Sequence, residues 1–261
     1  MLRIWIARPR TIRDPAVLDH LRALLSPDER ARLQKRPRAT AKQFLVTRGL
    51  VRWALSQFAP GVAPTAWDFA TGTHGKPCVA GPSSAPRISF NLSHSGELIA
   101  CAVAPVGQRV GVDVEDLARD RRFDRLADRF FAPSEAARVR SAVAADKPLC
   151  FYRYWTLKES YIKARGLGMA LPLSAFWFDL SRDITPRPPR IVFDERIDDD
   201  PESWSFSQQQ LDDRHLLALA LRGRGSVPPT PVASGAGGAS PDWGLWPSSH
   251  PGPRRCWGPA G

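Results

Sequence analysis

The order of apolar patterns along the chain constrains the fold most, because a strand, then helices, then several strands occurs twice. At the start of the chain every second residue is apolar, which is typical of a half-buried strand. Helical spacing follows, and one helix opens with Ser26 as a favourable N-cap. The expected helices are residues 14–25, a segment opened by Ser26, and 38–58, and the expected strands are 66–70, 88–93 and 97–104.

A second series of the same kind begins near Gln108. Its expected strands are residues 109–115, 175–180, 190–193, 203–207 and 214–221, and its expected helices are 121–131, 134–144 and 148–165. The sequence therefore predicts an α+β protein with two similar α/β halves, 1–108 and 109–222. Identity between the halves is too low to demonstrate a duplication.

Composition changes abruptly near the end of the chain. From Arg224 onward, 16 of 38 residues are Gly or Pro, and Asp242 is the only acidic residue. Such a segment cannot bury enough apolar surface to offset the entropy lost on ordering. We expect residues 223–261 to form a disordered Gly/Pro-rich tail.

A formal net charge of +11 indicates an anionic partner: nucleic acid, an acidic protein surface or a phosphorylated ligand. One alternative is a basic nucleic-acid-binding protein without catalytic activity, since nine tryptophans could stack on bases. No recognised nucleic-acid motif is present, however. Charge alone does not choose among these partners.

Several classes are disfavoured by simple patterns. No apolar run approaches the roughly 18 residues that a membrane helix needs, and the first residues lack the order of a signal peptide. We therefore expect a cytoplasmic protein without a membrane partner. The four cysteines include no CxxC pair, which suggests neither a zinc site nor a disulfide framework.

The segment G-V-D-V-E at residues 111–115 places two carboxylates, Asp113 and Glu115, on one face of a strand. An ordinary amphipathic strand explains the same pattern. Two carboxylates about 4–6 Å apart, however, repel by a few kcal/mol at an effective dielectric constant of about 20. A magnesium ion would relieve that repulsion and leave coordination positions for substrate phosphates.

The helix expected at 148–165 offers a third carboxylate. Helical geometry aligns Trp155, Glu159 and Lys163 on one face and sets Lys158 beside them. A surface ion pair between Glu159 and Lys163, with Trp155 in the core, is the alternative explanation.

Three further segments carry polar groups suited to phosphate binding. Ser93 and His94 lie between two expected strands, and Lys76 lies on a constrained turn. An ordinary turn explains the first segment equally well and is the more usual explanation of the second. Arg48 and Arg52 are four residues apart on the expected helix 38–58.

The motifs together resemble the 4′-phosphopantetheinyl transferase family, in particular the longer, two-domain type that includes the surfactin-synthetase activator. The resemblance spans residues 26–180. It rests on G-K-P at 75–77, F-N-L-S-H-S at 90–95, G-V-D-V-E at 111–115, R-F-F at 129–131 with Glu135 after it, and F-Y-R-Y-W-T-L-K-E-S-Y-I-K at 151–163. Five elements in the order of the family form a far more specific signal than any single one.

The resemblance implies a site between two halves that form an intramolecular pseudo-dimer. The implied ligands of Mg²⁺ are Asp113, Glu115 and Glu159. The implied contacts to the phosphates of coenzyme A are Lys158 and Lys163, with Lys76, Ser93 and His94 around the adenosine 3′-phosphate and Arg48, in competition with Arg52, as a further contact. Glu159 is also the candidate base that removes a proton from the attacking hydroxyl.

The family reaction moves the phosphopantetheine arm of coenzyme A onto a serine of an acyl, peptidyl or polyketide carrier protein, releasing 3′,5′-ADP. Carrier proteins of this kind are acidic, so the positive charge fits their attraction as well as nucleotide binding. The longer type implies a monomer that serves secondary metabolism. A Mg²⁺-dependent hydrolase with the same three carboxylates is a further alternative.

Overall fold

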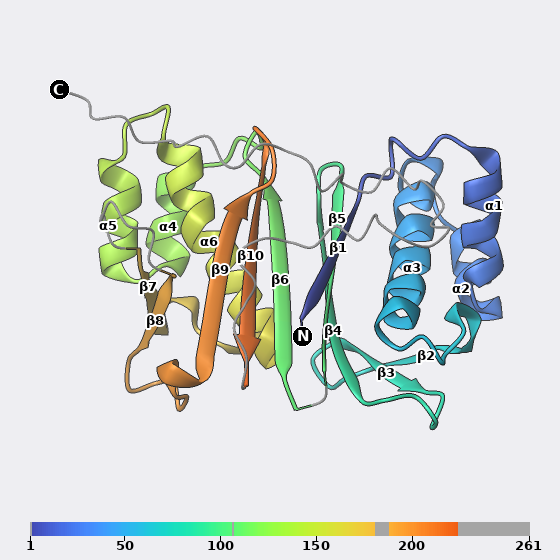
Figure 1. Cartoon of the computed structure of the whole chain (residues 1–261). Coiled ribbons are helices and arrows are strands. Elements are labelled where there is room, and N and C mark those ends of the chain that lie inside the picture. Colours follow the sequence, from blue (N-terminus) through green and yellow to red (C-terminus); the bar gives the residue numbers. More distant parts are fainter. Residues whose placement is uncertain (1, 106, 181–187, 224–261) are drawn as a thin grey trace.

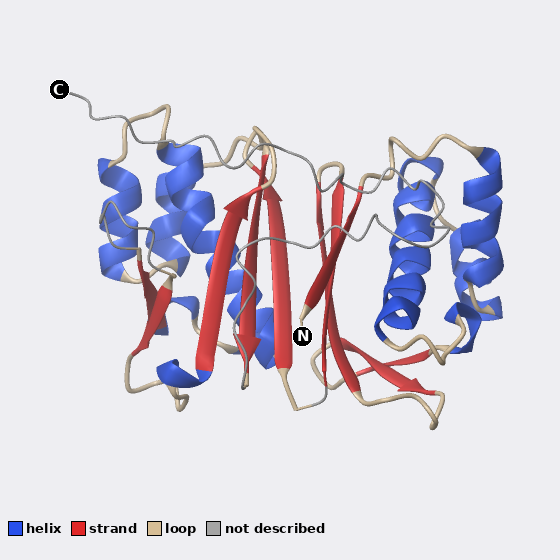
Figure 2. Cartoon of the chain, in the orientation of Figure 1, coloured by secondary structure: helices blue, strands red, loops and turns tan. Residues whose placement is uncertain are grey.

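The computed structural model describes residues 2–105, 107–180 and 188–223. Two three-stranded antiparallel sheets face one another, and each carries helices on its outer face (Figure 1). Figure 2 shows the resulting layers, with strands in the middle of the molecule and helices at both ends. The mixed α and β architecture predicted from the sequence is confirmed.

The first half begins with a strand and ends with two long strands. Its elements are β1 (Arg3–Ala7), α1 (Pro15–Leu24), α2 (Pro27–Gln34), α3 (Arg38–Phe58), a short 3₁₀ turn (Pro64–Ala66), β2 (Asp68–Thr71), β3 (Pro77–Gly81), β4 (Ile88–Ser95) and β5 (Leu98–Pro105). Ser26 caps α2, as predicted from the sequence, and it also forms a capping box with Glu29. Strand β3, which pairs with β2, was not predicted, because the G-K-P segment before it was interpreted as a turn.

The second half repeats this plan with other lengths. Its elements are β6 (Arg109–Asp116), α4 (Phe123–Phe130), α5 (Pro133–Ser141), α6 (Lys147–Arg165), 3₁₀ turns at Gly168–Ala170, Leu173–Ala175 and Pro201–Ser203, β7 (Phe176–Asp179), β8 (Arg190–Phe193), β9 (Trp204–Gln210) and β10 (His215–Arg222). Helix α6 ends at Gly166, whose φ of 72° is left-handed and suits glycine. Of the predicted 223–261 tail, residues 224–261 lie outside the described residues.

The sheet orders are β1-β5-β4 and β6-β10-β9, so β4 and β6 are edge strands. Apolar side chains from both sheets meet in a layer between them, separate from the two cores under the helices. The layer consists of Leu2, Ile4, Ile6, Leu98, Ala100, Ala102, Ala104, Val110, Val112, Val114, Leu211, Leu217, Leu219 and Leu221. Successive side chains of a strand point to opposite faces of its sheet. One face of each sheet therefore packs against helices and the other against the second sheet.

Candidate functional site

The two edge strands are joined by side chains rather than by a backbone ladder. Alternate residues of β4 accept hydrogen bonds from alternate amides of β6: Asn91 Oδ1 from Val112 N at 2.8 Å, Ser93 Oγ from Val114 N at 3.2 Å, and Ser95 Oγ from Asp116 N at 3.2 Å. Residue numbers increase in the same direction on both strands along these contacts, so β4 and β6 run parallel. We call these three residues of β4 the side-chain ladder.

Strand β6 also carries the two acidic residues predicted from the sequence. Asp113 is 4% exposed, and its Oδ1 accepts hydrogen bonds from Lys163 Nζ at 2.6 Å and Ser93 Oγ at 3.0 Å. Its Oδ2 is buried without a hydrogen-bond partner among the described residues. The Glu115 side chain is 14% exposed, and its Oε2 accepts a hydrogen bond from Ser95 Oγ at 2.8 Å. Both carboxylates are thus fixed by β4.

Helix α6 lies directly against β6 because Gly111 has no side chain. A Cβ there would lie 1.9 Å from Ser160 O and 2.5 Å from Ala164 N, both backbone atoms of the helix. This close approach brings Glu159 and Lys163 of α6 next to the carboxylates of β6. The glycine of the G-V-D-V-E motif is therefore a packing requirement of the site.

A pocket of about 360 Å³ opens where these elements meet. It is lined by Leu92, Ser93, His94, Asp113, Val114, Glu115, Trp155, Glu159 and Lys163. The structure thus brings together the three carboxylates proposed as metal ligands, together with Lys163, Ser93 and His94. These residues come from β4, β6 and α6, so both halves of the chain contribute to the pocket.

The pocket perturbs the carboxyl groups strongly. Burial raises the pKa of Asp113 to about 6 despite the lowering effect of Lys163. Burial and the neighbouring charge of Asp113 raise the pKa of Glu159 to about 7. Partial desolvation in the pocket, with Lys163 nearby, lowers the pKa of His94, although the residue keeps exposed surface. Excess negative charge in a partly buried space is the condition under which a carboxylate cluster favours a cation.

Within the described ranges, no group of three or more His, Cys, Asp or Glu side chains is already arranged around a single metal position. The donors nevertheless fit a hard cation. Their oxygens are carboxylate oxygens, and Asp113 Oδ2 is buried without a partner among the described residues.

Lys158, predicted to bind phosphate, does not line the pocket, and that prediction was wrong. Its side chain is fully buried, and its ammonium donates to Leu173 O at 2.8 Å and Phe176 O at 2.5 Å. Its third partner is Glu135 Oε2 at 2.7 Å. An ammonium has three donors, so none is left for a phosphate. Lys158 instead fixes the residues after α6.

Lys76 also uses its donors within the protein. Its Nζ donates to Lys163 O at 2.7 Å, Val110 O at 3.1 Å and Ala164 O at 3.3 Å. Burial lowers its pKa to about 8. The predicted contact between this ammonium and phosphate is corrected accordingly: Lys76 caps the C-terminal end of α6 and ties it to β6, from the other half of the chain.

Ser93 lines the pocket, but its hydroxyl has no hydrogen-bonding capacity left. It donates to Asp113 Oδ1 and accepts from Val114 N and from Lys163 Nζ at 3.0 Å. A hydroxyl has one donor and two acceptor positions, so all are used. In the described structure the Ser93 hydroxyl orients Asp113, and its contact with phosphate stays a prediction.

The two arginines of α3 do not line the pocket. Arg48 and Arg52 both form ion pairs with Glu29, and both guanidinium groups lie over the Phe69 ring. Arg52 is buried and also donates to Trp67 O at 2.7 Å, so it stabilises the first half. Of the two, Arg48 keeps more exposed surface, 18% of its side chain.

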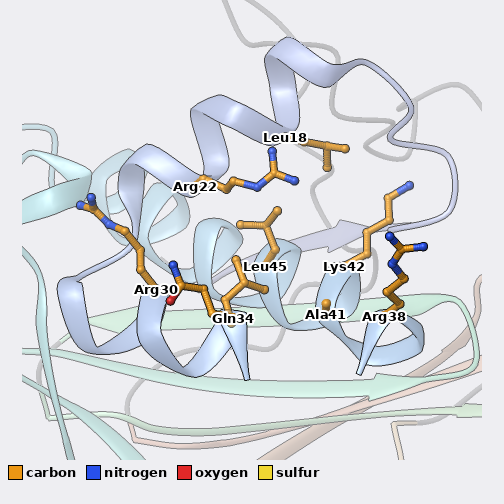
Figure 3. A pocket seen from close by; sticks show the side chains of 9 residues that line it. Leu18, Arg22, Arg30, Gln34, Arg38, Ala41, Lys42 and Leu45 are labelled. Carbon is orange, nitrogen blue, oxygen red and sulfur yellow. The ribbon is translucent and has the colours of Figure 1, made fainter. Parts of the chain in front are cut away.

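A larger hollow of about 550 Å³ lies away from this site, between α1, α2 and α3. Figure 3 shows leucines of α1 and α3 inside it, with arginines and a lysine around them. None of the predicted site residues lines it. Its basic rim alone does not define a ligand.

Sequence reasoning named Asn91, Ser95, Gly111 and Glu135 only as members of motifs and did not predict the contacts that the structure gives them. The signal for the first two was present, because polar residues occupy positions 91, 93 and 95 of a strand, all on one face. The partner of that face was not visible from the sequence.

Comparisons with known proteins point to one family. A family model described as the 4′-phosphopantetheinyl transferase superfamily matches residues 109–220. The 4′-phosphopantetheinyl transferase HetI of Nostoc sp. is 34% identical over 213 residues, which cover 81% of this chain and 84% of that protein. The 4′-phosphopantetheinyl transferase of Bacillus subtilis is 32% identical over 166 residues, covering 63% and 70%.

A vertebrate relative is similar over a shorter stretch. The L-aminoadipate-semialdehyde dehydrogenase-phosphopantetheinyl transferase of Xenopus laevis is 37% identical over 157 residues, 56% of this chain and 51% of that protein. These matches, with the pocket between β4, β6 and α6, show that the chain belongs to the 4′-phosphopantetheinyl transferase superfamily. It is an enzyme of that class. No helix in the described ranges is both long and apolar enough to cross a membrane.

Proposed function

We propose that this chain transfers the 4′-phosphopantetheine group of coenzyme A to a serine hydroxyl of an acyl, peptidyl or polyketide carrier protein. One observation carries the proposal beyond family membership: three carboxylates and a lysine from two elements line one pocket between the halves. The alternative of a nucleic-acid-binding protein has no comparable support, because the three carboxylates of this pocket would repel a phosphate backbone unless a metal ion is bound.

A divalent cation is part of the proposal, and magnesium is the ion that suits these donors. Asp113, Glu115 and Glu159 would hold it, with Asp113 Oδ2 as an oxygen that has no partner in the described structure. When bound, Mg²⁺ supplies charge neutralisation to the diphosphate of coenzyme A.

The residues of the chain supply the other requirements. In the reaction, a bond forms between the serine oxygen and the phosphorus attached to pantetheine, and the bond from that phosphorus to the bridging oxygen of 3′,5′-ADP breaks. Lys163 places a positive charge in the pocket, where it can stabilise the phosphates. Glu159 lines the same pocket, and its carboxylate is the candidate group that accepts the serine proton.

His94 and Arg48 remain as candidates for binding the nucleotide end. His94 lines the pocket and is exposed. Arg48 keeps part of its guanidinium at the surface, although Glu29 holds it. Both roles rest on the family resemblance and on these positions.

The two halves support a further part of the proposal. Each contributes a three-stranded sheet with helices on its outer face, and the pocket lies at their boundary. We propose that they form an intramolecular pseudo-dimer with halves 1–108 and 109–222, acting as a cytoplasmic monomer in secondary metabolism.

A direct test is incubation of the chain with coenzyme A, Mg²⁺ and an apo carrier protein, followed by intact-mass measurement of the carrier. We expect the carrier to gain the mass of one phosphopantetheine group. A carrier with its acceptor serine changed to alanine is the control and should gain nothing. Cleavage of coenzyme A without any gain on the carrier would instead support a hydrolase and overturn the proposal.

A further inference from the structure

The side-chain ladder has a second property besides joining the strands. Ser93 and Ser95 each accept a hydrogen bond from an amide of β6 and donate one to a carboxylate of the preceding residue. The first donor bond is 3.0 Å long, to Asp113 Oδ1, and the second is 2.8 Å long, to Glu115 Oε2. The same arrangement thus occurs twice, two residues apart on each strand.

A backbone ladder could not do this, because a carbonyl oxygen only accepts hydrogen bonds. A hydroxyl carries both a donor and acceptors, so a serine can satisfy the strand amide and orient the adjacent carboxylate at once. Ser95 is 3% exposed, which shields both of its bonds from competition with water.

The consequence is that each carboxylate has one fixed oxygen and one that remains available. Ser95 bonds Oε2 of Glu115, and Arg119 lies 4.0 Å from that same oxygen. Ser93 and Lys163 both bond Oδ1 of Asp113, which leaves Oδ2 without a partner in the described structure. Groups that hold metal ligands in orientation commonly act in this way.

We propose that Ser95 is a positioning residue of the site: its hydroxyl fixes Oε2 of Glu115 and turns the other carboxylate oxygen toward a divalent cation in the pocket. The inference rests on the proposed function for the identity of the cation site. Ser95 does not touch substrate in this proposal and acts only through Glu115.

The ladder itself supplies the comparison that separates positioning from simple joining of the strands. Asn91 accepts from Val112 N at 2.8 Å but donates to no carboxylate in the described structure. Removing the Asn91 amide should therefore weaken the contact between strands without disturbing a carboxylate. Ser89 lies on the same strand and the same face, and its hydroxyl has no hydrogen bond in the described ranges, so Ser89→Ala is a neutral control.

The experiment measures binding of Mn²⁺, a spectroscopic substitute for Mg²⁺, by electron paramagnetic resonance of the free ion, with no carrier present. Ser95→Ala should weaken Mn²⁺ binding about 10–100-fold, which is the usual effect of removing a hydrogen bond that orients a metal ligand. Ser95→Thr keeps the hydroxyl and should restore binding to within about 3-fold. Asn91→Ala and Ser89→Ala should bind Mn²⁺ like the unaltered chain. Melting temperatures of all variants confirm that each is folded at the assay temperature.

Several outcomes would overturn the inference. Mn²⁺ binding by Ser95→Ala that is unchanged, or weakened no more than in Asn91→Ala, would reduce Ser95 to a contact between strands. Failure of the unaltered chain to bind Mn²⁺ would overturn it as well. If that chain binds Mn²⁺ but transfers nothing to a carrier, the proposed function fails while the Ser95 result still stands on its own. Should Ser95→Ala fail to fold, the same comparison is made with Ser95→Cys.

Discussion

Substitution of Gly111 by alanine tests whether contact between β6 and α6 sets the geometry of the site. The added Cβ would lie 1.9 Å from Ser160 O, whereas ordinary contacts begin at 3.4 Å, so the helix must retreat by about 1.5 Å (3.4 − 1.9). Both clashing atoms belong to the helix backbone, so no side-chain rotation can relieve the overlap. Glu159 and Lys163 would move with the helix, away from Asp113.

The expected cost has two components. Overpacking of this kind destabilises by roughly 1–3 kcal/mol, and each kcal/mol lowers the melting temperature of a chain of this size by about 2–4 °C. A displacement of about 1 Å in reacting groups can reduce the rate about 10²-fold. We therefore expect Gly111→Ala to lose most transfer activity even at temperatures at which it remains folded.

The assay is the initial rate of carrier modification, measured well below the melting temperature of the variant. Gly61→Ala is the matched control, because a Cβ at Gly61 meets no atom within 4 Å. That variant should keep normal stability and activity. A Gly111→Ala protein with the melting temperature and rate of Gly61→Ala would refute the argument that this glycine sets the distance between helix and strand.

Three further predictions follow from individual contacts. Glu159→Gln should lower the transfer rate by at least about 10²-fold, as expected for loss of a general base, while calorimetry still detects coenzyme A binding; near-normal turnover would remove Glu159 from the mechanism. Lys158→Met should lower the free energy of unfolding, measured by urea titration, by about 3–5 kcal/mol, because it leaves the buried Glu135 carboxylate without its cation. The KM for coenzyme A should be unchanged in the folded protein; a selective rise in that KM would restore a phosphate role for Lys158. Asp212→Asn should destabilise the protein by about 1 kcal/mol after allowance for solvent screening. Burial raises the pKa of Asp212, but Arg8, the Arg214 amide and His215 outweigh it and hold that pKa at about 2. A depressed pKa stabilises the folded state above the ordinary value near 3.8, so the difference in unfolding free energy should be constant from pH 7 to 5 and shrink below pH 4; a difference that grows on acidification would contradict this.

Local patterns predicted much of the fold because the forces that start and end helices are local. Ser26 and Gly166 mark a helix start and a helix end through hydrogen bonds within a few residues. Alternation on β6 likewise placed Asp113 and Glu115 on one face, and spacing on α6 aligned Glu159 with Lys163. These four side chains lie in one pocket.

The roles of the lysines could not be predicted because they depend on carbonyl groups distant in sequence. Lys158 is adjacent to Glu159, yet a helical step of about 100° directs it to the buried side, where Leu173 and Phe176 supply carbonyls. The carbonyls around Lys76 belong to residues 34 to 88 positions away. A sequence motif shows that a cation is present but not whether its donors are already used.

The apolar layer between the two sheets makes the halves mutually dependent. A polypeptide limited to residues 109–222 would leave valines and leucines of β6 and β10 open to water, along with the amides of Val112, Val114 and Asp116. Such a fragment is expected to aggregate, or to dimerise so that a second copy covers the exposed face of the sheet. The smallest fragment expected to be active therefore contains both sheets, even though all three carboxylates of the pocket lie within residues 109–222.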